Sequence, residues 1–255
     1  MTHSVIRQSW ADRRIRLFRG VLALLCAVPL CGAAVSGRVE LKDSRDPAVK
    51  NRRDFSGVVI SLTPLSAAGL PVSSPPRVTN AAHLTITQRA KTFIPHMLAI
   101  QVGTWVDFPN LDPIFHNAFS SYSGQVFDVG LYPPGTNRSI RFTREGVVRV
   151  FCNIHSAMSA LIVVLATPHF AITKRDGTFE IADVPAGEYE LRVVHERATD
   201  ATLQTLSRRV SVTTAAAPLG ILSISESGYL PIPHKDKYGR DYAPEAVGLT
   251  GYTPK

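Results

Sequence analysis

Short runs of alternating or β-branched residues recur along the chain, and turn-forming residues separate them. Up to residue 165 these runs span 36–41, 57–62, 84–87, 97–101, 104–108, 139–142, 147–151 and 161–165. Gly103 divides two of them, and Phe108-Pro109-Asn110 ends the second of the two. Many short strands at this spacing are typical of a β-sandwich or barrel, so the pattern predicts an all-β fold.

A second group of strands is expected from about Pro168 onward. The runs 178–181 and 189–193 alternate on either side of Pro185-Ala186-Gly187, which predicts a hairpin, and Asp176-Gly177 predicts a tight turn before them. Runs at 208–212 and 219–224 supply two more strands. Because an isolated hairpin is only marginally stable, we expect these strands to form a smaller second sandwich.

Two segments carry no apolar period. Residues 42–54 are rich in charge, which predicts a surface loop, and residues 227–255 contain four prolines, which predicts an extended or disordered tail. The pattern therefore divides the chain from residue 35 onward into a first sandwich at 35–167, a second at 168–226 and a tail at 227–255.

The N-terminus has the three-part pattern of a secretory signal. Five arginines precede the apolar run 21–30, and the small residues Gly32, Ala33 and Ala34 follow it. We expect residues 1–34 to be a cleaved leader and the protein to be periplasmic or otherwise exported. The alternative is an uncleaved anchor, although the apolar run is shorter than the roughly 20 residues that a membrane span needs. After cleavage no stable membrane span is expected.

Removing the leader changes what the charge and the cysteines imply. The whole chain of 255 residues has a formal charge of +8, and the leader holds five arginines and one acid, so half of the positive excess leaves with it. Without a dense basic run, nucleic acid is not an expected partner. Two of the three cysteines also leave, and Cys152 then lacks a partner for an intrachain disulfide. It is an inert buried thiol, half of an intermolecular disulfide or a metal ligand.

The segment 147–158 combines three kinds of metal-ligating side chain. Strand alternation places Val148, Val150 and Cys152 on one face, and His155 and Met158 follow at intervals of three before the next strand. His116 supplies a second imidazole from an earlier segment. Two imidazoles, a thiolate and a weak axial thioether are the donor set of a blue-copper site. Taken singly, a buried Cys and a nearby Met are ordinary core residues.

These residues resemble the cupredoxins, the plastocyanin and amicyanin family of blue-copper proteins. The resemblance covers roughly residues 80–166 and is carried by Cys152-x-x-His155-x-x-Met158 and by Phe108-Pro109-Asn110 leading into His116-Asn117. With Phe127-Asp128-Val129-Gly130-Leu131-Tyr132, it extends to bacterial cupredoxin-like proteins labelled as methylamine-utilisation proteins. Asp176-Gly177-Thr178-Phe179 and Val184-Pro185-Ala186-Gly187-Glu188-Tyr189 are similar to the carboxypeptidase regulatory domain.

The resemblance implies a Greek-key sandwich with one type 1 copper. It implies His116, Cys152, His155 and Met158 as the copper ligands. It also implies a supporting role for Asn117, whose backbone N–H would point at the thiolate and whose side chain would tie the two ligand loops together. Of the other histidines, His96 is the one left open as a neighbour of the metal.

The leading functional hypothesis is an exported type 1 copper protein that carries single electrons between redox protein partners and is not an enzyme. The alternative is copper storage or delivery, or a non-catalytic binding or structural sandwich. A multicopper oxidase or nitrite reductase commonly needs His-x-His pairs, and the sequence has none. A zinc peptidase site of the form His-Glu-x-x-His needs a second histidine three residues after the glutamate. Here His195-Glu196 has Thr199 at that position. A Cys152–His155 nucleophile pair would leave His116 and Met158 unexplained.

Overall fold

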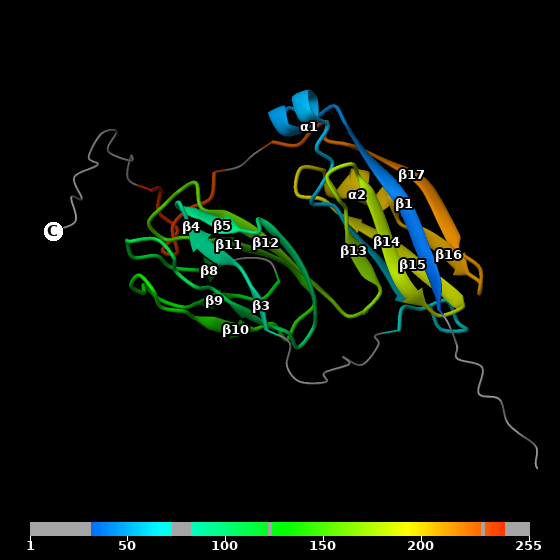
Figure 1. Cartoon of the computed structure of the whole chain (residues 1–255), viewed down its shortest axis with the longest axis horizontal. Helices are drawn as coiled ribbons and strands as arrows, with labels where there is room; N and C mark the ends of the chain where they lie inside the picture. Colours follow the sequence, from blue (N-terminus) through cyan, green and yellow to red (C-terminus); the bar gives the residue numbers. More distant parts are fainter. Residues whose placement is uncertain (1–31, 73–82, 122–123, 231–232, 243–255) are drawn as a thin grey trace, which may run out of the picture. The chain divides into compact units, whose positions relative to one another are not determined.

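The computed structural model of the protein describes residues 32–72, 83–121, 124–230 and 233–242. These residues form seventeen strands and two short helices, so the predicted all-β class is confirmed (Figure 1). Neither of the two helices is long and apolar enough to cross a membrane. Most of the predicted leader, 1–34, lies outside the described residues, and so do positions 243–255 of the predicted tail.

Two sheets combine strands from the two ends of the described chain, and we call this pair the terminal sandwich. The first sheet has the order β14-β1-β17, with β1 at Ala33–Lys42, β14 at Thr178–Val184 and β17 at Ala217–Ser225. The second has the order β13-β2-β15-β16, with β2 at Val59–Pro64, β13 at Phe170–Ile172, β15 at Gly187–Val194 and β16 at Arg208–Val212. One apolar cluster joins the two sheets, and fully buried Val39, Ile60, Leu62 and Leu191 belong to it.

The pairing within the terminal sandwich differs from two expectations. The strands β14 and β15 do not form a hairpin, because β14 pairs with β1 while β15 pairs with β2 and β16. The Pro185-Ala186-Gly187 turn instead carries the chain from one sheet to the other, and Phe179 and Tyr189 meet in the same core. The strands β1 and β2 lie in the part of the chain that the sequence assigns to the first sandwich, but they pair with β14 and β17 and with β13 and β15. This pairing brings their buried side chains into one core with those of β14 and β15.

The Asp176-Gly177 turn leads into β14 and requires its glycine. Gly177 has a φ of +83°, and a Cβ atom there would lie 2.2 Å from the carbonyl oxygen of Val39. The Gly177 carbonyl accepts a hydrogen bond of 2.8 Å from the Val39 N–H. The turn therefore lies directly against β1, where a larger residue has no room.

The strands from the middle of the chain form a separate group of sheets, which we call the central sandwich. Its largest sheet has the order β6-β12-β11-β8-β9, with β6 at Met97–Gln101, β8 at Phe119–Ser120, β9 at Phe127–Asp128, β11 at Gly146–Phe151 and β12 at Ser159–Leu165. A three-stranded sheet has the order β10-β7-β3, with β3 at His83–Thr85, β7 at Trp105–Asp107 and β10 at Ser139–Arg141. The strands β4, Thr87–Arg89, and β5, Thr92–Ile94, pair with each other.

The core of the central sandwich contains the predicted thiol. Phe108, Phe142, Val148, Val150, Cys152 and Met158 are fully buried in one cluster. The strand β12 is apolar throughout because both of its faces are covered: Ile162 belongs to this core, and Leu161 and Val163 pack in another cluster with Val59. A strand buried on both faces has a continuous apolar sequence.

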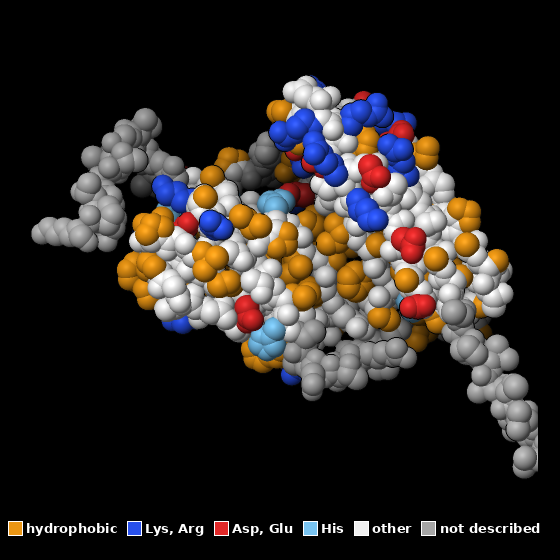
Figure 2. Space-filling model, viewed as in Figure 1, with side chains coloured by type: hydrophobic (Ala, Val, Ile, Leu, Met, Phe, Trp, Pro, Cys, Tyr) orange, Lys and Arg blue, Asp and Glu red, His pale blue; other side chains and the backbone are white. Residues whose placement is uncertain are grey.

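The charged segment 42–54, predicted as a loop, contains the helix α1, Pro47–Arg52. The Asp46 carboxylate caps it by accepting a 2.7 Å hydrogen bond from the Ala48 N–H, and Pro47 occupies the first turn. Figure 2 shows Lys and Arg side chains gathered around α1, and exposed Lys50, Arg52 and Arg53 lie in or directly after the helix. The other helix, α2, spans Asp200–Leu206 and begins with Thr199 as its cap. Capping and proline placement stabilise α1 although it has no apolar period.

A buried carboxylate makes the terminal sandwich sensitive to acid. Glu226 accepts hydrogen bonds from His195 (2.8 Å), Arg197 (3.1 Å) and Ser44, and Arg197 also pairs with Asp46. Burial alone would raise the pKa of Glu226, but these bonds lower it from 4.5 to about 2. A depressed pKa contributes stability above the unfolded-state value, and this contribution is lost as the pH falls from about 4.5 towards 2.

We therefore expect Glu226→Gln to destabilise the protein by about 2 kcal/mol at pH 7 and to flatten its pH dependence below pH 4.5. Urea unfolding of the full chain at pH 7 and pH 3 measures both effects. Glu180→Gln, on the exposed face of β14, is the matched control and should change neither. An unchanged acid dependence in Glu226→Gln would contradict the assignment.

Candidate metal centre

The thiol of Cys152 lies at the end of a strand, inside the core. The strand β11 ends at Phe151, and its alternation buries Val148, Val150 and then Cys152, which has 0% exposure. Cys152 is a free cysteine, and the two other cysteines lie outside the described residues. The fold therefore fixes one reduced sulfur atom at one end of the central sandwich.

The chain turns tightly after Cys152, and we call residues 152–158 the ligand loop. The Cys152 N–H donates to the Met158 carbonyl (3.2 Å), and the Met158 N–H donates to the His155 carbonyl (3.1 Å). Phe151 pairs with Ser159 where β11 and β12 meet, so the loop is closed at its base. The Met158 side chain is fully buried in the same cluster as Cys152, while His155 is half-buried.

The second imidazole, His116, reaches the thiol from a separate segment of the chain. His116 is fully buried and pairs with Tyr132 through an isolated β-bridge. Its Nε2 lies 2.8 Å from the Asp112 carboxylate, which also accepts hydrogen bonds from the N–H groups of Ala90 and Lys91. Because a carboxylate accepts, Nε2 carries the proton, and the lone pair of Nδ1 faces the thiol.

The carboxylate of Asp112 is held in its charged form. Burial alone would raise the pKa of Asp112, but hydrogen bonds from Lys91, His116 and Ala90 lower it below its usual value. A buried imidazole with a fixed carboxylate partner has a fixed ring orientation. Such a partner is the usual support of a metal-binding histidine.

Three donor atoms converge at this point. The Cys152 sulfur lies 3.8 Å from Nδ1 of His116 and 3.6 Å from Nδ1 of His155. The ligand atoms of the three residues all lie within 4.8 Å of one another, and the two imidazole ring centroids are 4.8 Å apart. Two nitrogens and one thiolate, with a buried thioether at Met158 in the same cluster, fit the preferences of copper.

Asn117 and His96, the two other residues that the sequence suggested for the site, lie differently from what the sequence predicts. The Asn117 side chain donates to Asp128 (2.7 Å) and to the Gly130 carbonyl (2.9 Å), and thus not to the ligand loop that it was expected to join. Its position after His116 directs it towards β9 instead. His96 bonds to the Ser159 carbonyl and to Glu196, and it is outside the group of three converging ligands.

Asp112 is a site residue that the sequence analysis did not identify. Its available signal is the short spacing Asp112-x-x-x-His116, which keeps a carboxylate close to the imidazole when the chain between them bends. Tyr132 is another, since its hydroxyl donates to the Phe108 carbonyl (2.8 Å) and its backbone pairs with His116. Asp112 and Tyr132 thus position His116 without touching the atoms that would bind the metal.

We expect Asp112→Asn to weaken Cu(II) binding by roughly 10- to 100-fold, because the neutral amide is a weaker acceptor for the His116 Nε2–H and turns an NH2 group towards one of the N–H donors that the carboxylate now accepts from. Competition with a chelator of known affinity measures the effect. Asp107→Asn is the matched control, since the Asp107 carboxylate pairs with the exposed His83 at 3.1 Å. Equal affinity in wild type and Asp112→Asn would exclude the orienting role.

No protein-family model matches the chain, and no curated protein matches it. Solved structures do match. The copper-containing nitrite reductase from Thermus scotoductus SA-01 is 25% identical with a TM-score of 0.31, and the match covers 40% of this chain and 25% of that one. A reduced mutant of amicyanin is 19% identical with a TM-score of 0.31, covering 42% of this chain and 98% of that one. A purple cupredoxin from Nitrosopumilus maritimus is 28% identical with a TM-score of 0.29, covering 33% and 99%. The chain thus spans about a quarter of the nitrite reductase chain.

Proposed function

We propose that the protein is an exported type 1 copper protein that carries single electrons between redox protein partners. The observation that carries this proposal is the convergence of His116, Cys152 and His155 within 4.8 Å of one another. Met158, buried in the same cluster as Cys152, would supply the fourth ligand. Copper bound by these residues would supply a one-electron couple.

The burial of the ligands favours electron transfer over catalysis. His116, Cys152 and Met158 are fully buried, which keeps water and substrates away from three of the four proposed ligands. Side chains locked in a packed core also change position little when the charge of a bound ion changes. A small rearrangement of this kind favours rapid electron exchange.

His155 is the proposed point of electron entry and exit. It is the half-buried member of the set, and its neighbour Ile154 is 46% exposed. Phe115, next to His116, is 50% exposed. Exposed apolar side chains on the segments that carry the ligands would give a partner protein a surface that loses water easily on contact.

The optical and EPR spectra of the full chain after addition of Cu(II) test the proposal. We expect the intense blue thiolate-to-copper band, with reversible loss and recovery on chemical reduction and reoxidation. A colourless Cu(II) complex would refute the proposed site. Very tight Cu(I) binding without cycling would replace electron transfer by copper storage or delivery.

The proposed location depends on the leader. The structure begins the strand β1 at Ala33, which is buried and pairs with Val184, so the last two residues of the expected leader belong to a sheet. Export from a bacterial host and sequencing of the N-terminus of the released protein would show whether cleavage occurs and at which residue. The similarity of the second group of strands to the carboxypeptidase regulatory domain stays a prediction.

A further inference from the structure

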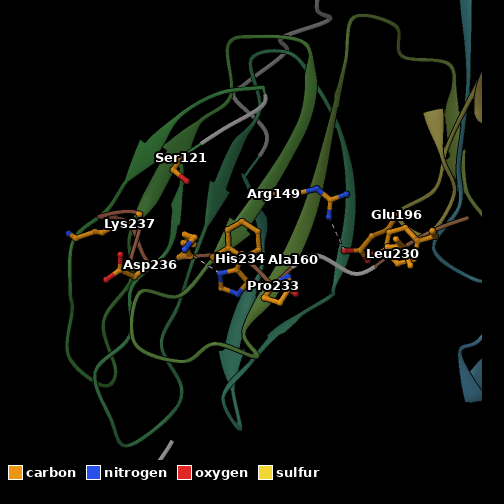
Figure 3. Close-up of a pocket in the computed structure, with 14 residues that line it drawn as sticks. Ser121, Arg149, Ala160, Glu196, Leu230, Pro233, His234, Asp236 and Lys237 are labelled. Carbon is orange, nitrogen blue, oxygen red and sulfur yellow. Dashed lines mark hydrogen bonds and ion pairs between the residues drawn. The ribbon is translucent and has the colours of Figure 1, made fainter. Parts of the chain in front are cut away.

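The segment 233–242 near the C-terminus lies against the ligand loop. The segment and Ala160 of β12 line a pocket of about 660 Å³. Figure 3 labels Pro233, His234, Asp236 and Lys237 among its lining residues. The imidazole of His234 stacks on Phe151, the residue before Cys152, with ring centroids 3.9 Å apart and an interplanar angle of 23°. This segment belongs to the predicted tail, which the proposed copper site does not need for any ligand.

Three hydrogen bonds connect the segment to the ligand loop. The Tyr242 hydroxyl donates to the Cys152 carbonyl (2.7 Å), and the Lys237 N–H donates to the side-chain oxygen of Asn153 (2.9 Å). The His234 Nε2–H donates to the Ser156 carbonyl (2.7 Å). These bonds hold the ligand loop at Cys152, Asn153 and Ser156, and the stack holds Phe151 directly before it.

The same segment connects the two halves of the metal centre. The Lys237 ammonium donates to Asp128 (2.7 Å), and the other oxygen of that carboxylate accepts from Asn117, the residue after His116. The path from Asn117 through Asp128 and Lys237 to Asn153 therefore links the two ligand-bearing segments. This is the connection that Asn117 was expected to make directly.

The segment has an ordered structure of its own. Asp236 accepts from the N–H groups of Tyr238 (2.9 Å) and Arg240 (2.8 Å) and from the Arg240 guanidinium (3.1 Å). The rings of His234 and Tyr242 meet edge to face with centroids 5.1 Å apart. A turn stabilised in this way brings both of its ends to the ligand loop.

We propose that residues 233–242 form a clamp that holds the ligand loop in its metal-binding arrangement before the metal enters, with Tyr242 and His234 as positioning residues. The identity of the metal as copper rests on the proposed function. A loop that is already ordered loses less entropy when the ion binds, which strengthens binding and slows release. Neither residue touches the donor atoms, so both act through the backbone of the loop.

Hydrogen exchange of the metal-free full chain tests the clamp without relying on copper. We expect Tyr242→Phe and His234→Ala each to speed exchange in peptides covering the ligand loop by roughly fivefold. This factor corresponds to the net free energy that one ordinary hydrogen bond contributes. Exchange in β6, on the far side of β12, should stay unchanged. Tyr238→Phe is the matched control, because Tyr238 lies in the same segment but is 64% exposed and packs on Lys237 and Arg240.

The copper-loaded protein gives two further measurements, the rate of copper release and the position of the absorption band, which a purely structural role of Tyr242 would leave unchanged. In Tyr242→Phe we expect Cu(II) to transfer to a chelator roughly fivefold faster than in Tyr238→Phe, together with a shift of the thiolate-to-copper band. Loop exchange equal to wild type in both Tyr242→Phe and His234→Ala would overturn the clamp. A wild-type protein without the blue band would overturn the proposed function, and the metal-free exchange would still decide for or against the clamp.

Discussion

Replacing Cys152 with serine is expected to abolish the thiolate-to-copper absorption band completely. The band requires a sulfur ligand, and Cys152 has the sulfur atom that lies within 4 Å of both imidazoles. A hydroxyl at this position stays protonated and binds copper weakly. Optical spectra of wild type and Cys152→Ser, each titrated with Cu(II), measure the loss.

The control for this variant keeps the thiolate and changes a neighbour. Met158→Leu has nearly the same volume in the same core cluster, so it should retain an intense band at a shifted position. Far-UV circular dichroism should show the β fold in both variants. A blue Cys152→Ser protein would rule out Cys152 as the ligand.

The second large effect is expected from Phe108→Ala, which should destabilise the metal-free protein by about 3–5 kcal/mol. Phe108 is fully buried, and its ring contacts Phe93 and Phe127 in the core of the central sandwich. Truncation leaves a cavity that the surrounding strands can fill only in part. Urea unfolding followed by tryptophan fluorescence measures the change.

Phe115→Ala is the matched control, because it removes the same atoms from a side chain that is 50% exposed. We expect it to alter the free energy of unfolding by no more than about 0.5 kcal/mol. Similar losses for the two variants would show that the core of the central sandwich is not packed around Phe108. The contrast separates burial from residue type.

Strands with a clear alternation could be predicted from the sequence almost to the residue. The expected runs 97–101 and 208–212 coincide with β6 and β16. The strands β8 and β9 have two residues each, which is too short for any period to be visible. The helix α1 also escaped prediction, since it rests on a cap and a proline instead of an apolar face.

Strand partners were harder to predict than strands, because pairing depends on residues far away in the sequence. The nearest alternating neighbours, β14 and β15, join different sheets, and each finds its partner in the N-terminal strands β1 and β2. A turn such as Pro185-Ala186-Gly187 is compatible both with a hairpin and with a crossing between two packed sheets. Local pattern alone does not distinguish these two outcomes.

The metal centre likewise combines features that local spacing predicts with contacts that are distant in the sequence. Cys152, His155 and Met158 lie within one short loop, so their spacing alone made them visible as a set. The contacts that hold the centre come from elsewhere: Asp112 reaches Lys91 across 21 residues, and Tyr242 reaches Cys152 across 90. Supporting contacts of this kind have no fixed spacing from the ligands, and they became visible only in the folded chain.

The parallel pairing of β1 with β17 has a consequence for the order of folding. Ser44 and Glu226, at the end of that pair, are 182 residues apart, and the whole central sandwich is inserted between β2 and β13. The strands β1 and β2 therefore can pair only after the rest of the chain is available, whereas the central sandwich can form from contacts that are closer in the sequence. Pulse-labelling hydrogen exchange during refolding is expected to show protection of β11 and β12 before protection of β1. The N-terminal strand would then be among the last to form its hydrogen bonds.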